Sequence, residues 1–310
     1  MSWCLAAAFL ARSFCATLEG LSETLTLQAS ADTSLWELDP TFNFGGESEL
    51  VAGTLGPFGD QARSRLLWRF DIATALPANA IIESAQLQFT VVRTPTGAQS
   101  STFALHRVLQ LWNEGSNTGE LPGGAPASDD GATWRTAGSS DWSIPGGALG
   151  TDFAAEASGS VAVVGNGTYT INFTESGLAD LESIRANASA SHGWVLISQS
   201  EDTPKTARRI AAKENSSGAP SLEITYTIPS PAEIPILEQR FDREAEEVVI
   251  TVSTELGTTY VLERVVSPAA QSWTPLTEVT GNASGTLEMR GSTAGLNAAF
   301  FRVTGTPPVT

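Results

Sequence analysis

Residues 65–72 read RLLWRFDI and carry the clearest strand pattern in the chain. Its odd-numbered positions include the charged residues Arg65, Arg69 and Asp71. Its even-numbered positions are all apolar: Leu66, Trp68, Phe70 and Ile72. Because successive side chains of a β-strand point to opposite faces, this period of two predicts a strand with one buried face and one charged face.

Similar short runs continue toward both ends of the chain, between turns rich in Gly, Pro, Asn, Asp and Ser. A single helix is expected where Leu178, Leu181 and Ile184 recur at three-residue spacing, after a cap at Thr174 or Ser176. The predicted class is therefore all-β: a jelly-roll-like β-sandwich with one short helix, followed by a small antiparallel β domain. Further strands are predicted over 25–29, 85–91, 103–109, 169–173, 194–198 and 222–227, and then over 248–252, 260–266, 276–279, 286–289 and 300–303.

Prolines and apolar runs suggest how the chain is divided. Pro229 and Pro231 cannot both lie inside a strand ladder, which predicts a linker. A short apolar run at the start favours secretion or display at the cell surface, with a wrongly assigned start codon as the alternative. Cys4 and Cys15 both lie in that first segment, so its removal would leave no disulfide. The predicted segments are a truncated signal segment at 1–21, the sandwich at 22–228, a Pro-rich linker at 229–235 and a small β module at 236–310.

The chain is acidic and poor in reactive groups. Its 310 residues include 34 Asp and Glu against 17 Lys and Arg, for a formal net charge of −17. Binding to nucleic-acid phosphates needs a basic surface, so this charge argues against it. The sequence contains no Gly-x-Ser-x-Gly, His-Glu-x-x-His or P-loop motif. With two His in the whole chain, we therefore expect a protein that is not an enzyme.

Ten short motifs follow one another in a fixed order over about two-thirds of the chain. In this order they resemble a DNRLRE domain over 24–228, a module of secreted bacterial proteins related to a family of carbohydrate-binding modules. The family usually has Asp after its Trp-x-x-Pro-Gly-Gly element, where this chain has Ala148, so no ligand role carries over to that position. The motifs are Ala31-Asp32-Thr33, Asn43-Phe44-Gly45, 65–71, 81–87, 105–108, Trp112-Asn113-Glu114, Ala132-Thr133-Trp134, 142–147, His192-Gly193-Trp194 and 220–226.

A second resemblance covers the shorter segment 236–304. The runs 260–263, 273–276 and 300–303 are similar to a C-terminal module common in secreted proteins of Verrucomicrobia-like bacteria. This likeness implies a secreted bacterial protein and no particular activity for the segment.

Arginines on the strand quoted above are the first candidate binding residues. Arg63, Arg65 and Arg69 share one strand face by alternation, and Arg93 and Arg107 would extend this basic stripe on neighbouring strands. A guanidinium is a planar fork that suits carboxylates. The stripe therefore predicts a groove for an acidic, uronate-containing polysaccharide, as the resemblance allows. The alternative is structural, with the arginines paired to Asp71, Glu83 or other local carboxylates.

Tryptophans in a long segment between strands are the second candidates. Trp112, Trp134 and Trp142 lie in or beside residues 111–153, which is too long for an ordinary connection. Exposed indole rings can stack on the C–H face of a sugar ring. Buried rings would instead pack the segment onto the sandwich and would need a partner for the indole N–H. The sequence leaves both readings open.

Oxygen ligands for a structural Ca²⁺ are the third candidate feature. Asp32, Asn43 and Glu214, or the adjacent pair Asp129 and Asp130, could supply them, although no EF-hand spacing is present.

Taken together, the residues and the resemblance predict a non-catalytic polysaccharide-binding module of a secreted bacterial protein. The ligand would be a polysaccharide, with uronate as the candidate unit, and no nucleic acid, membrane insertion or oligomer is expected. The alternative is a structural or adhesive cell-surface module without a sugar ligand.

Overall fold

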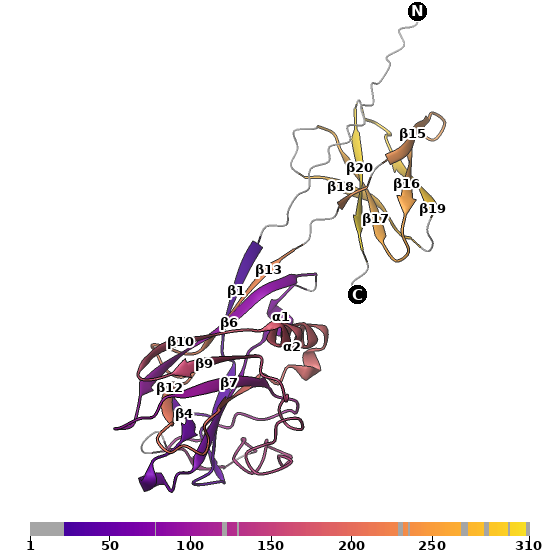
Figure 1. The fold of residues 1–310 in the computed structure, drawn as a ribbon. Helices are drawn as coiled ribbons and strands as arrows, with labels where there is room; N and C mark the ends of the chain where they lie inside the picture. The colour runs from indigo at the N-terminus through magenta and orange to yellow at the C-terminus, as the bar shows by residue number, and fades with distance from the viewer. Residues whose placement is uncertain are drawn as a thin grey trace, which may run out of the picture. The chain divides into compact units, whose positions relative to one another are not determined.

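The computed structural model shows an all-β protein (Figure 1). Contacts within the chain separate two compact units, Leu21–Ile228 and Pro229–Thr310. The residues described are 22–77, 79–119, 123–128, 130–228, 232–234, 236–267, 272–281, 285–296 and 298–307. The predicted signal segment with both cysteines, and Asp129, lie outside them.

The larger unit is a curled antiparallel sheet, and every strand ladder in it is antiparallel. Its main path runs through β1 (Ser22–Gln28), β13 (Ser221–Thr227), β6 (Ile81–Arg93), β12 (Arg208–Ala211), β4 (Glu49–Thr54), β5 (Arg63–Arg69), β11 (Trp194–Ser198), β7 (Ser101–Arg107) and β9 (Gly159–Val163). Off this path, β10 (Gly167–Asn172) pairs with β6 and β2 (Ala31–Trp36) pairs with β5. A small ladder joins β3 (Phe42–Asn43) to β8 (Ala125–Pro126).

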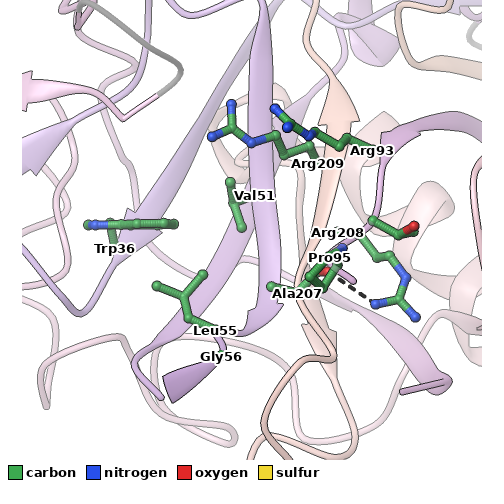
Figure 2. Close-up of a pocket in the computed structure, with 10 residues that line it drawn as sticks. Trp36, Val51, Leu55, Gly56, Arg93, Pro95, Ala207, Arg208 and Arg209 are labelled. Atoms are coloured by element: carbon green, nitrogen blue, oxygen red, sulfur yellow. Dashed lines mark hydrogen bonds between the residues drawn. The ribbon is translucent and has the colours of Figure 1, made fainter. Parts of the chain in front are cut away.

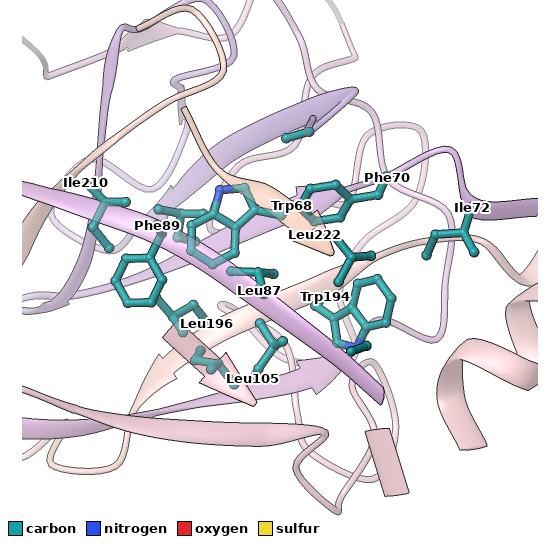
Figure 3. Packing of buried hydrophobic residues seen from close by; sticks show 14 of the residues in the cluster. Trp68, Phe70, Ile72, Leu87, Phe89, Leu105, Trp194, Leu196, Ile210 and Leu222 are labelled. Carbon is teal, nitrogen blue, oxygen red and sulfur yellow. The ribbon is translucent and has the colours of Figure 1, made fainter. Parts of the chain in front are cut away.

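The main core lies inside the curl of this sheet. It joins apolar side chains of β5, β6, β7, β11 and β13 (Figure 3). Trp68 of β5 packs on Phe89 of β6 with ring centroids 5.6 Å apart, so strands distant in the path meet across the core. The four even-numbered apolar residues of 65–72 are fully buried here, which confirms the predicted inner face of the strand.

The outer face of β5 is also covered, which the sequence did not predict. Leu67, at an odd-numbered position, belongs to a second core together with Val195 of β11. The long segment after β7 lies over this face and contributes Trp112, Trp134 and Trp142 to the same core. β5 therefore has a core on each side, and the expectation of one face open to solvent is wrong.

Two α-helices and two short 3₁₀ turns occur in the described part of the chain. Helix α2 (Glu175–Ala186) begins after Thr174, whose side-chain oxygen accepts a hydrogen bond from the Gly177 N–H at 3.3 Å. This confirms the predicted helix and one of its two proposed caps. The remaining elements are α1 (Ile72–Ala75), η1 (Pro57–Gly59) and η2 (Ala188–Ala190).

The smaller unit has two sheets around its own apolar core, which includes Ile250, Tyr260 and Leu262. The predicted linker 229–235 is partly a strand, because Ala232 and Glu233 form β14 and pair with β20. One sheet has the order β14 (Ala232–Glu233), β20 (Phe300–Thr306), β17 (Thr259–Val265) and β18 (Thr274–Thr280). The other has β15 (Ile236–Asp242), β16 (Glu247–Thr254) and β19 (Gly285–Ser292).

Candidate binding groove and the arginine face

Arg63, at the start of β5, is paired within the chain. Its Nε and Nη2 donate to the two carboxylate oxygens of Glu37, at 2.9 and 2.6 Å. These hydrogen bonds lower the pKa of Glu37 from its usual value. The guanidinium also lies 5.3 Å from the centroid of the Trp134 ring. The forked contact matches a carboxylate, as the sequence predicts, but the carboxylate belongs to the protein itself.

Arg65 is more completely occupied. Its Nε and Nη2 donate to the two carboxylate oxygens of Glu201, at 2.8 and 2.7 Å. Its Nη1 donates to the carbonyl oxygens of Gly146 and Gly147, at 2.8 and 2.7 Å. The side chain is only 12% exposed, so it is an internal anchor for the segment that carries Gly146 and Gly147.

Arg69, the third arginine of this face, contacts Trp112 through both its ring and its backbone carbonyl. The Arg69 guanidinium lies 5.0 Å from the centroid of the Trp112 ring, and its Nη1 donates to the Trp112 carbonyl at 3.2 Å. Trp112 is fully buried, and its indole N–H donates to the carbonyl of His192 at 2.6 Å. A cation over an aromatic face stabilises such an arrangement by about 0.5–2 kcal/mol, depending on its exposure.

The other two predicted tryptophans are also inside the protein. Trp134 and Trp142 are each 4% exposed. The Trp142 indole N–H donates to the carbonyl of Thr133 at 2.9 Å, and its ring packs on Phe153 at a centroid distance of 5.4 Å. Sugar stacking requires an exposed ring face, so the expectation that these three tryptophans contact a glycan loses its basis. Packing of the long segment onto the sandwich accounts for their burial.

Arg107 does not belong to the arginine face. In the register it pairs with Trp194 of β11, which in turn pairs with Trp68 of β5. Paired residues point to the same side of a sheet, and both tryptophans belong to the main core. Arg107 therefore points to the opposite face from Arg65, where its Nε is 2.7 Å from Asp180 Oδ1 on helix α2. The predicted extension of the stripe through Arg107 is wrong.

An open groove lies on the outer surface of β4, β6 and β12, away from that face (Figure 2). Its volume is about 320 Å³. Leu50 and Ile210 point into the main core, and their neighbours Val51 and Arg209 line the groove on the other side of the sheet. The residues around it are Trp36, Val51, Leu55, Gly56, Arg93, Thr94, Pro95, Ala207, Arg208 and Arg209.

Two arginines face each other along one side of this groove. Arg93 of β6 and Arg209 of β12 are direct cross-strand partners, and Figure 2 shows their guanidinium groups side by side. Arg209 Nη1 is 3.4 Å from Glu49 Oε2, which is a long contact. Arg93 is exposed, and its side chain makes no hydrogen bond or ion pair with the described residues. Like charges directly opposite each other on a sheet are destabilising, so this pair favours an anion.

Trp36 and Arg208 complete the description of the groove. Trp36, at the end of β2, is half-buried, and its ring packs on Phe44 at a centroid distance of 5.3 Å. In Figure 2 it lies on the other side of Val51 from the two arginines. Arg208 is 1% exposed and donates to the carbonyls of residues 99 and 206, at 2.6 and 2.8 Å. Its guanidinium is therefore used inside the protein and does not face a ligand in the groove.

Two of the predicted Ca²⁺ ligands, Asp32 and Glu214, lie close together, and Glu114 joins them. Carboxylate oxygens of Asp32, Glu114 and Glu214 lie within 4.8 Å of one another. The amide of Asn43 is used by backbone groups. Its Nδ2 donates to the carbonyls of Glu114 and Ala132 at 2.7 and 2.9 Å, and its Oδ1 accepts from the Gly45 N–H at 3.0 Å. Asn43 therefore positions the backbone beside Glu114, and its role as a ligand stays a prediction that these hydrogen bonds do not favour.

Sequence reasoning missed two parts of these sites. The first is Glu114, the third carboxylate of the cluster. It comes two residues after the buried Trp112 in the Trp112-Asn113-Glu114 motif, and this place beside a buried ring could have marked it as a candidate ligand. Arg209 pairs with Arg93 only through the register of two strands far apart in the sequence, for which the sequence carries no local signal.

Comparisons with known proteins add little. No protein-family model matches the chain, and no curated protein does. A solved structure, the N-terminal tandem CBM22-1-CBM22-2 domain of Xyn10C from Paenibacillus barcinonensis, is similar over 95% of this chain and 93% of that one. The sequence identity is 8% and the TM-score 0.26, so the functional argument below depends on the geometry of this chain alone. The search for membrane-crossing helices finds none of sufficient length and hydropathy in the described residues.

Proposed function

We propose that residues 22–228 form a non-catalytic module that binds an acidic polysaccharide in the groove between Trp36 and the Arg93–Arg209 pair. The observation that carries this proposal is the cross-strand arginine pair. Of these two adjacent guanidinium groups, only that of Arg209 has a carboxylate partner among the described residues, Glu49 at 3.4 Å, in a chain where acidic residues outnumber basic ones two to one. A uronate carboxylate would accept hydrogen bonds from such a fork and relieve the repulsion between the two cations.

The shape of the groove supports a sugar as the carrier of that carboxylate. Trp36 places a flat, partly buried ring at the groove, and Val51 and Ala207 form an apolar floor. A volume of about 320 Å³ is at the lower end of ligand sites. It would hold roughly one or two sugar rings of a longer chain. Because each contact is small and ordering the polymer is costly, we expect modest affinity.

The residues that line the groove support binding without catalysis. Glycoside hydrolysis commonly uses a pair of Asp or Glu side chains beside the scissile bond. Among the described residues that line the groove there is no Asp, Glu, His or Cys, and the nearby Glu49 is paired with Arg209. The lining therefore lacks the general acid and base that such a reaction needs.

Affinity electrophoresis tests the proposal. The full chain is run through gels that contain polygalacturonate, alginate or neutral xylan, beside gels without polysaccharide. We expect retardation by at least one uronate polymer, and loss of that retardation in Arg93→Ala and in Arg209→Ala. Arg135→Ala is the matched control, because Arg135 is also exposed and its side chain makes no hydrogen bond or ion pair with the described residues.

The second candidate function is a structural or adhesive module without a sugar ligand. The burial of Arg65 and of all three loop tryptophans in contacts within the chain favours it. The same gels decide between the two functions. If wild-type protein runs alike with and without each uronate polymer, the proposal is wrong and the structural function stands.

A further inference from the structure

Three separate segments bring carboxylates together at one edge of the larger unit. Asp32 lies on β2, Glu114 on the long segment after β7, and Glu214 on the turn that follows β12. Their oxygens lie within 4.8 Å of one another. The Asp32 N–H donates to Glu114 Oε1 at 2.7 Å, so a hydrogen bond already joins the first two segments at this point.

Asp32 provides the second observation, because one of its oxygens has no partner. The residue is 0% exposed, and its Oδ2 accepts a hydrogen bond from the Lys213 N–H at 2.7 Å. Its Oδ1 is buried and has no hydrogen-bond partner. Burial raises the pKa of Asp32 to about 8, and the nearby carboxylates of Glu214 and Glu114 add to the increase. A buried carboxylate oxygen without a partner is costly unless a proton or a metal ion compensates it.

The charge of the cluster points to a divalent cation. Lys213 contacts both glutamates, with its Nζ 3.3 Å from Glu114 Oε1 and also beside Glu214 Oε1. With Asp32 protonated, as its raised pKa implies without an ion, the two glutamates and one ammonium leave a net charge of about −1, which becomes about −2 when Asp32 ionises as a ligand. Lys213 therefore neutralises only part of the cluster, and its Nζ does not bond Asp32 Oδ1.

We propose that Asp32, Glu114 and Glu214 bind one Ca²⁺, with Asp32 Oδ1 as the buried ligand. Hard carboxylate oxygens from three separate segments suit Ca²⁺, which accepts irregular coordination by six to eight oxygens. Mg²⁺ demands a near-ideal octahedron and keeps several waters, which fits a buried ligand poorly. The ion would tie the long tryptophan-bearing segment to β2 and to the turn after β12. This proposal is independent of the sugar-binding groove.

The experiment uses the full chain after treatment with EDTA and desalting. Calorimetric titration with CaCl₂ and separately with MgCl₂ measures affinity, and thermal unfolding with and without Ca²⁺ measures its effect on stability. We expect one Ca²⁺ per chain, weaker or no Mg²⁺ binding, and a higher Tm with Ca²⁺. Glu214→Gln is expected to weaken Ca²⁺ binding at least about tenfold. Glu156→Gln is the matched control, since Glu156 is exposed and outside the cluster.

Asp32→Asn separates a metal ligand from a structural residue. The variant keeps an oxygen for the Lys213 N–H and removes the buried charge, so in EDTA its Tm should equal or exceed that of the wild type. The increase of Tm with Ca²⁺ should disappear. Absence of Ca²⁺ binding by the wild type, or a wild-type response to Ca²⁺ in both Asp32→Asn and Glu214→Gln, would overturn the proposal.

Discussion

Arg65 joins three segments that are far apart in the sequence. Its guanidinium meets the Glu201 carboxylate and the carbonyls of Gly146 and Gly147 while almost fully shielded from water. Arg65→Ala would leave Glu201 without its partner, so we predict a loss of about 3 kcal/mol in the free energy of unfolding. Urea denaturation measures it. Arg93→Ala serves as comparison and should change stability by less than about 0.5 kcal/mol, as is usual for exposed positions.

Lys213 competes with a divalent cation for the same carboxylates. Its ammonium contacts Glu114 and Glu214, so Lys213→Gln removes a positive charge beside the proposed Ca²⁺. Repulsion between one and two charges across roughly 5 Å of water-like medium is about 1.7 kcal/mol, so Ca²⁺ affinity should rise on the order of tenfold. Calorimetric titration checks this. Weaker Ca²⁺ binding in the variant would mean that Lys213 positions the ligands instead of competing with the ion.

His106 predicts a pH dependence of stability. Burial lowers its pKa in the folded state below the ordinary value of 6.5, although its Nδ1 hydrogen bond to the Ala154 carbonyl, at 2.9 Å, opposes the shift. The unfolded chain therefore binds a proton more readily. The stability due to neutral His106 is fully present above pH 6.5 and is lost as the pH falls from there to the folded pKa.

His106→Gln should reduce that loss. We expect a smaller fall in the free energy of unfolding below pH 6.5 for the variant than for the wild type, measured by urea denaturation at a series of pH values. Equal slopes for the two proteins would show that His106 does not titrate as its burial implies.

At the scale of single residues, the sequence predicts which kind of group a side chain can bind better than which partner it meets in the fold. Asp32 and Glu214 are found together as predicted, because carboxylates near turns are natural oxygen ligands. The amide of Asn43 is used by neighbouring backbone groups that no local pattern reveals. Arg65 pairs with a carboxylate of the chain, as the structural alternative predicts, but the partner is the distant Glu201 and not Asp71 or Glu83, because the fold decides which carboxylate is near.

At the scale of elements, the long segment 109–153 behaves as part of a core. Asp152 helps to fix its path, because its carboxylate accepts hydrogen bonds from the backbone N–H groups of Ser143 and Ala148, at 3.1 and 2.7 Å. The segment has few regular strands, so its stability depends on such contacts and on its buried rings. Disturbing its packing should therefore affect the whole larger unit.

Two glycines of this segment allow a matched test. Both have positive φ, +79° at Gly147 and +81° at Gly150. A Cβ at Gly147 would lie 2.4 Å from the Phe153 ring, whereas a Cβ at Gly150 would meet nothing within 4 Å. Both Ala variants incur backbone strain of about 1–3 kcal/mol, and only Gly147→Ala adds a clash. We predict that Gly147→Ala lowers the free energy of unfolding by at least about 1 kcal/mol more than Gly150→Ala. Equal losses by urea denaturation would contradict this packing.

Strands were easier to predict than the layers they form. Alternation identifies the inner face of 65–72, and helical spacing with a capping residue identifies α2. The second core could not be predicted, because its members come from β2, β5, β11 and a segment without periodicity. An outer strand face that carries both Arg65 and Leu67 is ambiguous until its covering segment is known.

At the scale of the whole molecule, net charge and local charge have opposite effects. A net charge of −17 repels a polyanion at long range, while Arg93 and Arg209 attract it at the groove. Salt screens both interactions over about 8–10 Å at 0.1–0.15 M ionic strength. The attraction acts at short range between partly desolvated groups, so specific binding should survive moderate salt, whereas the rate of association should respond more strongly.

If the Arg93–Arg209 groove, and not the buried arginine face, binds an acidic glycan, binding must depend on these two exposed arginines. Calorimetric titration of a short uronic-acid oligosaccharide into the full chain and into the double variant Arg93→Gln, Arg209→Gln, with Arg135→Gln as control, tests this dependence. We expect binding by the wild type and the control and at least about tenfold weaker binding by the double variant, as expected for charge-assisted contacts. Undiminished binding by the double variant, or none by the wild type, would rule out this groove as the glycan site.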